Sequence, residues 1–251
     1  MKKIIVVSLL LFISLLSAKS MAISITTYRL LINNTQPEAD FYVFSNEIYD
    51  QACNITLRDY VFDKNGNSKE HKGSERPDIS AKKLLRYSPR RFELKAGASQ
   101  KVHFKYRRKK SKIPTEYRSY LSLDCKQLNE KRESKAQTDI KPNLRHNIPI
   151  IVRTGNIEVD IKFSEINVTN NIISFSLNKS GKRSVYGDVV LINNQNNEEI
   201  HRKRAVSLPV EVDKMSIILP LLKLSPNLID IQFIEDKKLS GDANVKVSVI
   251  N

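Results

Sequence analysis

The chain is poor in the residues on which most compact catalytic motifs depend. It has two cysteines, four histidines, seven glycines and no tryptophan among 251 residues. Two cysteines exclude a disulfide-dense miniprotein and a four-cysteine zinc site, and the four histidines form no helical metal-ligand pair. No phosphate-binding loop, nucleophile elbow or dinucleotide fingerprint is present. We therefore expect no enzyme, with no catalytic residue, no metal and no cofactor.

The chain also lacks an apolar run long enough to cross a bilayer. Its longest run, residues 4–16, follows two lysines and falls short of the roughly 20 residues that a spanning helix needs. A basic start, a short apolar stretch and then small residues are typical of a secretory signal. We predict a signal peptide over residues 1–22, with cleavage after Ala18 as the alternative to Ala22, and no membrane span after cleavage. A retained anchor is the competing interpretation.

Acidic residues are scarce relative to basic ones, which gives a net charge of +15. Removal of the predicted signal peptide, with its three lysines, lowers this charge to about +12. A basic run at residues 105–112 could contact nucleic acid, anionic lipid or an acidic protein surface. Its one tyrosine is fewer stacking faces than a nucleic-acid platform needs. We interpret the run as a solvated hairpin tip, with electrostatic steering of a partner as the alternative, and expect no nucleic-acid partner.

What is present is a pattern of β-strands. Apolar residues alternate with polar ones, or cluster in short runs rich in Ile, Val, Phe and Tyr between turn residues. Residues 64–83 and 126–139 are polar and are predicted to be loops. The predicted strands are 23–32, 41–48, 53–62, 84–87, 91–94, 100–106, 116–125 and 140–152, followed by 157–163, 172–177, 186–192, 206–212, 216–222, 228–234 and 245–250.

A turn at residues 154–156 divides these strands into two groups. Each group has about the length of an immunoglobulin-like sandwich, which is roughly 100 residues. The sequence therefore predicts an all-β protein with domains at residues 23–153 and 154–251.

The two cysteines lie at complementary ends of predicted strands. Cys53 starts one strand and Cys125 ends another, so the two meet if the strands are antiparallel neighbours. Export would place them in an oxidising compartment. We predict a disulfide between them; two unpaired buried thiols are the alternative.

Four segments carry a resemblance to a known family. They are YSPRRFELKAGASQKV at 87–102, IPTEYRSYL at 113–121, NIPIIVR at 147–153 and GKRSVYGD at 181–188. Their combination resembles the periplasmic chaperones of the chaperone–usher pathway, which assemble pili and fimbriae on Gram-negative bacteria. The resemblance implies two immunoglobulin-like sandwiches at an angle with a cleft between them. It also implies a periplasmic location, and pilus subunits and an outer-membrane usher as partners.

The resemblance further implies donor-strand complementation, in which the chaperone lends a strand to an incomplete subunit and passes the subunit to the usher. The lending strand should be the run before residue 154. Ile140, Leu144 and Ile148 share one parity and are the candidates for inserted side chains. Two prolines in this run are awkward, since proline cannot donate to a β-ladder. An ordinary core strand of the first domain is the alternative interpretation.

Chaperones of this family anchor the subunit's C-terminal carboxylate with a basic pair in the cleft. The resemblance places Arg29 as the member on the first strand, and an Arg fork suits a carboxylate. The second member is a Lys in many relatives, and Pro149 occupies that position here. Arg153, Arg118 or His146 could substitute, or a single cation could suffice.

A second function from another class is also compatible with the sequence. A secreted two-domain immunoglobulin-like adhesin or structural protein could use its basic surface to hold anionic polymers. Salt separates the two functions, because a charge-driven contact weakens as ionic strength rises.

Overall fold

The computed structural model describes residues 23–107, 113–128, 144–221 and 225–249. The predicted signal peptide, the donor candidate Ile140 and most of the basic run at 105–112 lie outside these residues.

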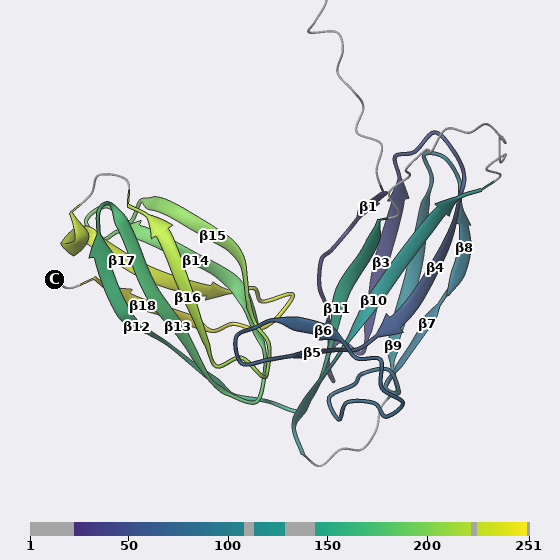
Figure 1. The fold of residues 1–251 in the computed structure, drawn as a ribbon, viewed down its shortest axis with the longest axis horizontal. Helices are drawn as coiled ribbons and strands as arrows, with labels where there is room; N and C mark the ends of the chain where they lie inside the picture. Colours follow the sequence, from purple (N-terminus) through teal and green to yellow (C-terminus); the bar gives the residue numbers. More distant parts are fainter. Residues whose placement is uncertain (1–22, 108–112, 129–143, 222–224, 250–251) are drawn as a thin grey trace, which may run out of the picture.

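The first half of the chain folds into two sheets packed face to face (Figure 1). One sheet has the strand order β1-β3-β9-β7 and the other β2-β11-β10-β4-β8, while β5 and β6 pair only with each other. The strands are β1 (Ile23–Ile25), β2 (Leu30–Ile32), β3 (Glu38–Ser45), β4 (Gln51–Arg58), β5 (Tyr60–Phe62), β6 (Ser68–Glu70), β7 (Leu85–Ser88), β8 (Arg91–Leu94), β9 (Ser99–Tyr106), β10 (Thr115–Gln127) and β11 (Arg145–Thr154).

The second half forms a second sandwich, with sheets of order β12-β13-β16 and β15-β14-β17-β18. A 3₁₀ turn, η1 (Pro226–Leu228), precedes β17. The strands are β12 (Val159–Thr169), β13 (Ile172–Gly181), β14 (Val185–Asn193), β15 (Glu199–Leu208), β16 (Lys214–Pro220), β17 (Ile229–Glu235) and β18 (Asn244–Ser248).

Each sandwich buries its own apolar core. Successive strand residues point to opposite faces, so alternation sends every second side chain inward, as at Phe41 and Val43 of β3. The first core extends to Val152 and the second begins at Ile161, and the two share no residue. The predicted fold class is therefore confirmed, with the two sandwiches set as arms at an angle (Figure 1). The boundary between residues 153 and 154 stays a prediction.

The prediction of one continuous strand over residues 23–32 was wrong. β1 pairs with β3 in one sheet, whereas β2 pairs in parallel with β11 in the other sheet. The chain crosses between the sheets at residues 26–29, where the Thr27 hydroxyl donates to the carbonyl of Arg29 at 2.7 Å. Both halves are apolar enough to be strands, so alternation alone did not reveal the crossing.

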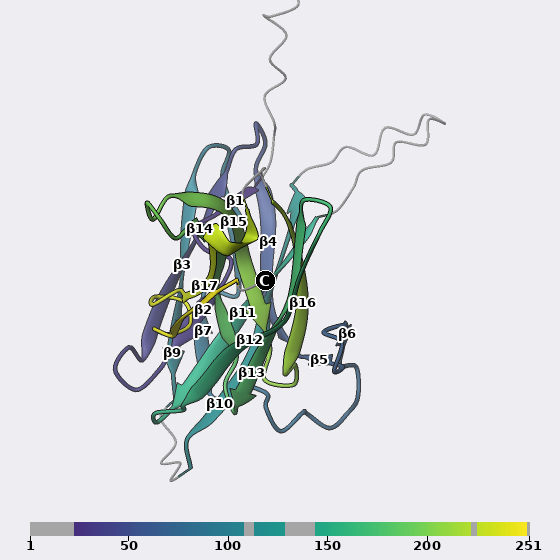
Figure 2. The same cartoon turned by 90° about the vertical axis from the view of Figure 1, so that its left-hand side faces the viewer.

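A second difference concerns residues 53–83. The predicted strand 53–62 is interrupted at Asp59, which is buried, and its last residues form β5 of a separate hairpin with β6. The hairpin turn has Gly66 at φ +84°, a conformation that favours glycine. Figure 2 shows the hairpin standing out to one side of the sandwiches. Residues 64–83 are therefore not one exposed loop, and Ala81 within them is fully buried.

The structure pairs Cys53 with Cys125 in a disulfide. The two cysteines face each other directly in the register of β4 and β10, and both are buried. The predicted disulfide is therefore present, and its two cysteines lie on neighbouring antiparallel strands. The bond joins residues 72 positions apart and so restricts a large loop of the unfolded chain.

Removing this disulfide should destabilise the first sandwich strongly. In the chain-entropy account a loop of this length is worth about 4 kcal/mol, so a Cys53→Ala/Cys125→Ala variant should lose about that much unfolding free energy in urea titrations. Wild-type protein held in reductant is the control and should lose a similar amount. A variant as stable as the oxidised wild type would contradict the expectation.

Candidate functional site

A pocket of about 190 Å³ lies between the two sandwiches. Strands β10 and β11 and the β5–β6 hairpin contribute to it from the first sandwich, and the β14–β16 region contributes from the second. Its lining residues are Arg29, Phe62, Asn65, Gly66, Arg118, Tyr120, Pro149, Ile151, Ser184, Ser207, Pro209, Val212 and Met215.

The β10–β11 ladder sorts its side chains between this cleft and the first core. Tyr120 is directly opposite Pro149, and Arg118 is directly opposite Ile151. Directly opposed residues point to the same face, and all four line the pocket. The alternate residue Ile148 belongs to the first core instead. The position where the resemblance expects a lysine thus faces the cleft but carries a proline ring.

Arg29 enters the cleft from the crossing between β1 and β2. Its side chain is 3% exposed, with Nε donating to the carbonyl of Leu239 at 2.9 Å and Nη2 donating to Ser184 Oγ at 2.8 Å. The guanidinium also lies 5.2 Å from the ring centroid of Tyr186, within the range of a cation–π contact. Nη1 has no hydrogen-bond partner within the described residues, which leaves one donor group for a ligand.

Burial lowers the pKa of Arg29 to about 10; Glu116 raises it and Arg153 lowers it further. The guanidinium therefore stays positively charged at neutral pH. A buried charge with an open donor is costly unless an anion or polar group completes its contacts.

Of the three residues considered for a second cation, Arg118 shares the pocket with Arg29. Its charge is already matched, because Nη2 and Nη1 bind the two carboxylate oxygens of Glu211 at 2.7 and 3.0 Å. The guanidinium also lies 4.5 Å from the ring centroid of Phe62 on the hairpin. Arg118 thus fastens the hairpin and the second sandwich to β10.

Arg153 does not line this pocket and is fully engaged elsewhere. Its Nε donates to Glu116 at 2.7 Å, its Nη2 to the carbonyl of Ser184 at 2.8 Å, and its Nη1 to the carbonyl of Ser240. Glu116 in turn accepts from the amide of Ser184 at 3.0 Å. These buried contacts join the start of β10 and the end of β11 to the second sandwich, and each of the three guanidinium nitrogens of Arg153 takes part in them.

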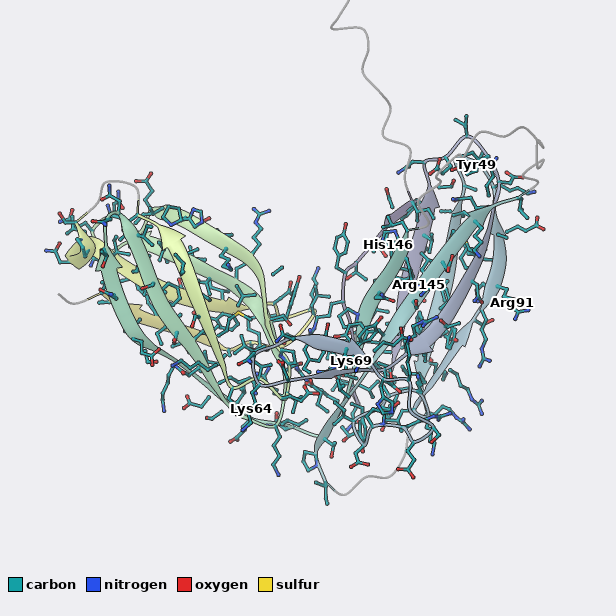
Figure 3. All side chains as sticks on the ribbon, in the orientation of Figure 1. Tyr49, Lys64, Lys69, Arg91, Arg145 and His146 are labelled. Atoms are coloured by element: carbon teal, nitrogen blue, oxygen red, sulfur yellow. A yellow bond between two sulfur atoms is a disulfide. The ribbon has the colours of Figure 1, made fainter. Side chains whose placement is uncertain are left out.

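His146 is the third residue considered. It lies on β11, opposite Leu123, and does not line the cleft pocket. Its Nε2 is buried without a hydrogen-bond partner in the described part of the chain. Figure 3 shows His146 and Arg145 on β11, whereas Lys64 and Lys69 mark the hairpin between the two sandwiches.

Tyr120 is a pocket residue that the sequence analysis missed. It stands beside Pro149 across the β-ladder, and its ring packs edge-on against Tyr60 at 4.8 Å between centroids. Burial raises the pKa of its phenol, and the charges of Arg118 and Arg29 only partly oppose this. The hydroxyl therefore stays protonated at neutral pH and can donate a hydrogen bond.

The candidate side chains of the predicted donor strand differ in their exposure. Leu144 is 65% exposed, as an inserted side chain requires, but Ile148 is 2% exposed and packs in the first core. Ile148 cannot fill a partner's groove without leaving its own core, so that candidate was wrong. Ile140 lies outside the described residues.

The backbone beside Leu144 has an open edge. β11 pairs with β10 along its whole length, but with β2 only at residues 150–152. The opposite edge of β11 at residues 145–149 has no partner strand among the strands that the structure describes. Unpaired backbone groups at such an edge can accept another strand.

A second polar cluster supports the cleft from the second sandwich. Glu235 is buried and accepts hydrogen bonds from Arg183 at 2.9 Å, from Ser240 at 2.6 Å and from the amide of Ala243 at 3.0 Å. Ser240 is the residue whose carbonyl binds Arg153, so the cluster continues the contacts between the sandwiches.

Within the described residues, no group of His, Cys, Asp or Glu is arranged to hold a metal ion. No helix in that same part of the chain is long and apolar enough to cross a membrane.

No family model and no curated protein matches the sequence. Solved structures do match. The complex of the SafA pilin with the SafB chaperone of Salmonella enterica matches with a TM-score of 0.51 and 11% identity, over 92% of this chain and 98% of the other. The complex of the CsuC chaperone with the CsuE tip subunit from archaic Csu pili of Acinetobacter baumannii matches with a TM-score of 0.50 and 9% identity, over 92% and 100%.

The chain has the fold of the chaperone–usher pilus chaperones. At this level of identity the likeness concerns the fold, and the pilus-chaperone fold covers nearly the whole described chain. The residues that hold its two sandwiches together therefore have to be tested on this protein itself.

The buried Glu116 should be essential for the contact between the sandwiches. Glu116→Gln removes the charge that Arg153 requires, and breaking a buried ion pair costs about 3–5 kcal/mol. Urea unfolding should show a loss of that order, and small-angle scattering should show a larger radius of gyration. An exposed pair offers the matched control: Glu93→Gln should change either quantity little, because surface pairs contribute about 0–1 kcal/mol.

Glu235 should make stability fall in acid. Its hydrogen bonds outweigh the effect of burial, which alone raises its pKa, so the folded-state pKa lies below its ordinary value. The stabilisation is present above the unfolded-state pKa of about 4.3 and is lost as pH falls through the folded-state pKa. Glu235→Gln should be less stable at neutral pH, and its deficit should shrink below about pH 4. Parallel stability–pH curves for the two proteins would contradict this expectation.

Proposed function

We propose that the protein is an exported, periplasmic chaperone that binds pilus or fimbrial subunits by lending them a strand and delivers them to an outer-membrane usher. Two of the matched structures are complexes of a chaperone with a pilin and with a tip subunit, which supports this class of partner. The proposed action is binding and release, without catalysis or a cofactor.

One observation carries the proposal: an open strand edge leads into the pocket that holds Arg29. The edge of β11 at residues 145–149 is unpaired within the described chain, and β2 occupies the same edge from Ile150 onward. Leu144, next to this edge, exposes its side chain. An added strand gains affinity from main-chain hydrogen bonds and register from side-chain pockets.

The pocket at the end of this edge suits a carboxylate. Arg29 offers Nη1, which has no partner among the described residues, and the protonated hydroxyl of Tyr120 offers a second donor. We propose that Tyr120 takes the part that a lysine plays in relatives, because Pro149 leaves that position without a charge. Arg118 contributes less, since Glu211 already matches its charge.

The first test is capture of a subunit from the periplasm of the protein's own host. Tagged wild type should retain a small secreted subunit in equal proportion through a high-salt wash, because an inserted apolar strand resists salt. Leu144→Asp should abolish capture, while Ile218→Asp, at a site 66% exposed in the second sandwich, should leave it unchanged. Equal capture by the Leu144→Asp and Ile218→Asp variants would contradict the strand-lending proposal.

The anchor is tested in the same experiment with Tyr120→Phe and Arg29→Lys. Each lost hydrogen bond to a charged carboxylate is worth about 1.5–3 kcal/mol, which corresponds to roughly 10- to 100-fold weaker capture. Thermal unfolding of each variant checks that the fold is intact. If both variants captured the subunit as well as wild type does, the proposed carboxylate anchor would be wrong, and the strand-lending part of the proposal would stand. A partner held only at low salt would favour the adhesin function instead.

A further inference from the structure

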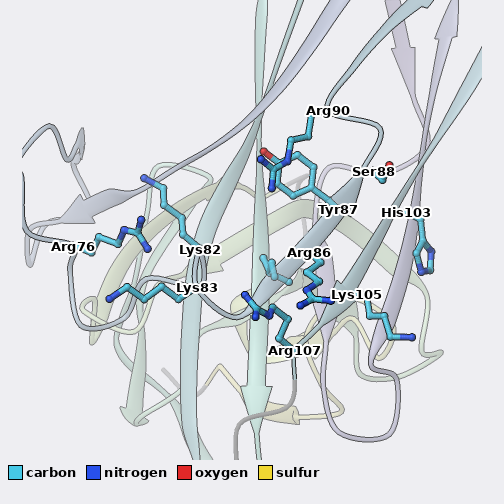
Figure 4. A pocket seen from close by; sticks show the side chains of 11 residues that line it. Arg76, Lys82, Lys83, Arg86, Tyr87, Ser88, Arg90, His103, Lys105 and Arg107 are labelled. Atoms are coloured by element: carbon cyan, nitrogen blue, oxygen red, sulfur yellow. The ribbon is translucent and has the colours of Figure 1, made fainter.

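A second hollow, which we call the basic hollow, opens on the first sandwich and shares no residue with the cleft pocket. It has a volume of about 950 Å³, and Figure 4 shows basic side chains converging on it from several elements. Its lining residues are Arg76, Lys82, Lys83, Leu85, Arg86, Tyr87, Ser88, Arg90, His103, Lys105 and Arg107.

The basic hollow carries a large uncompensated positive charge. Seven of its eleven lining residues are Arg or Lys, and none is acidic. Asp59 pairs with Lys82 at 3.1 Å, and Glu38 pairs with Lys105 at 2.5 Å. Five further side chains are exposed and form no ion pair with a described residue: Arg76, Lys83, Arg86, Arg90 and Arg107.

These charges sit on a backbone that is held in place. Ala81 is fully buried, and its amide is bound by Ser119 Oγ at 3.0 Å, which ties the lysine-bearing turn to β10. The amide of Arg107 donates to the carbonyl of Leu84 at 2.6 Å. The like charges therefore cannot separate by moving the backbone, so an anion that binds between them relieves their repulsion.

An open strand edge runs through the same place. β7 is the last strand of its sheet and pairs only with β9 among the described strands. It contributes Leu85, Arg86, Tyr87 and Ser88 to the hollow. A peptide aligned on this edge would gain main-chain hydrogen bonds while its acidic side chains meet the surrounding cations.

We propose that the basic hollow binds an extended acidic segment of a partner protein, which adds to the free edge of β7. This interaction surface goes beyond the proposed function and does not rest on it. A bilayer surface has no peptide backbone that could pair with the free edge of β7. Single-stranded nucleic acid needs open aromatic faces, and the ring of Tyr87 is covered by Arg90 at 5.0 Å.

The test uses the mature protein and a fluorescent ten-residue peptide of alternating Asp and Thr. Anisotropy should report binding that weakens with salt. A triple variant, Lys83→Gln/Arg86→Gln/Arg107→Gln, should bind at least tenfold more weakly. The matched control, Lys203→Gln/Arg204→Gln/Lys238→Gln, removes the same charge from exposed sites in the second sandwich and should bind like wild type.

Two further probes test the manner of binding. The same peptide with alternate amides N-methylated should bind several-fold more weakly, because it cannot complete a β-ladder. Vesicles of zwitterionic lipid with added phosphatidylglycerol should bind no better to wild type than to the triple variant.

Three results would overturn the proposal. An equal loss in both triple variants would mean that net charge alone is responsible. If the N-methylated peptide bound as tightly as the unmodified peptide, binding by strand addition to β7 would be ruled out. Vesicle binding that depends on the three residues, without peptide binding, would assign the basic hollow to a membrane surface.

Discussion

The arrangement of the two sandwiches depends on one buried ion pair. Glu116 and Arg153 are opposite each other where β10 begins and β11 ends, and both reach across to Ser184 of the second sandwich. The amide, hydroxyl and carbonyl of Ser184 are all bound by first-sandwich side chains, including Arg29. Fixing the second sandwich at this point fixes the walls of the cleft, so the geometry around Arg29 depends on a pair that does not itself line the cleft pocket.

Much of the fold follows from strand alternation in the sequence, including the two sandwiches, most strands and the disulfide. The differences arise where alternation carries no information. Apolar residues continue through the sheet crossing at 26–29, and the start of β15 is so polar that only its end at Val206–Leu208 was predicted. The roles of the cleft residues were harder to predict from the sequence, because they depend on contacts with residues that are distant in the chain. Arg118 was a candidate for the second cation, but in the structure Glu211 already matches its charge.

Two of the open strand edges of the first sandwich differ in the side chains around them. At β11 the edge has an exposed leucine beside it and ends in the small pocket that holds Arg29. At β7 the edge lies among five cations without ion pairs in the described chain. Both edges thus have backbone groups free to pair with another strand, but the side chain beside the β11 edge is apolar and those around the β7 edge are positively charged. Edges that are left unprotected usually promote aggregation, and the two proposals assign each of these edges a partner that matches the side chains around it.

The crossing between β1 and β2 also bears on the direction in which an added strand would run along β11. β2 lies on the edge of β11, in parallel, from Ile150 onward, and Arg29 immediately precedes β2. The guest strand that we propose for residues 145–149 would therefore be collinear with β2 and would end at Arg29. If its last carboxylate is what Arg29 holds, the guest must run in the same direction as β11. Two short strands and one turn of the chain would thus fix both the direction of the added strand and its register along β11.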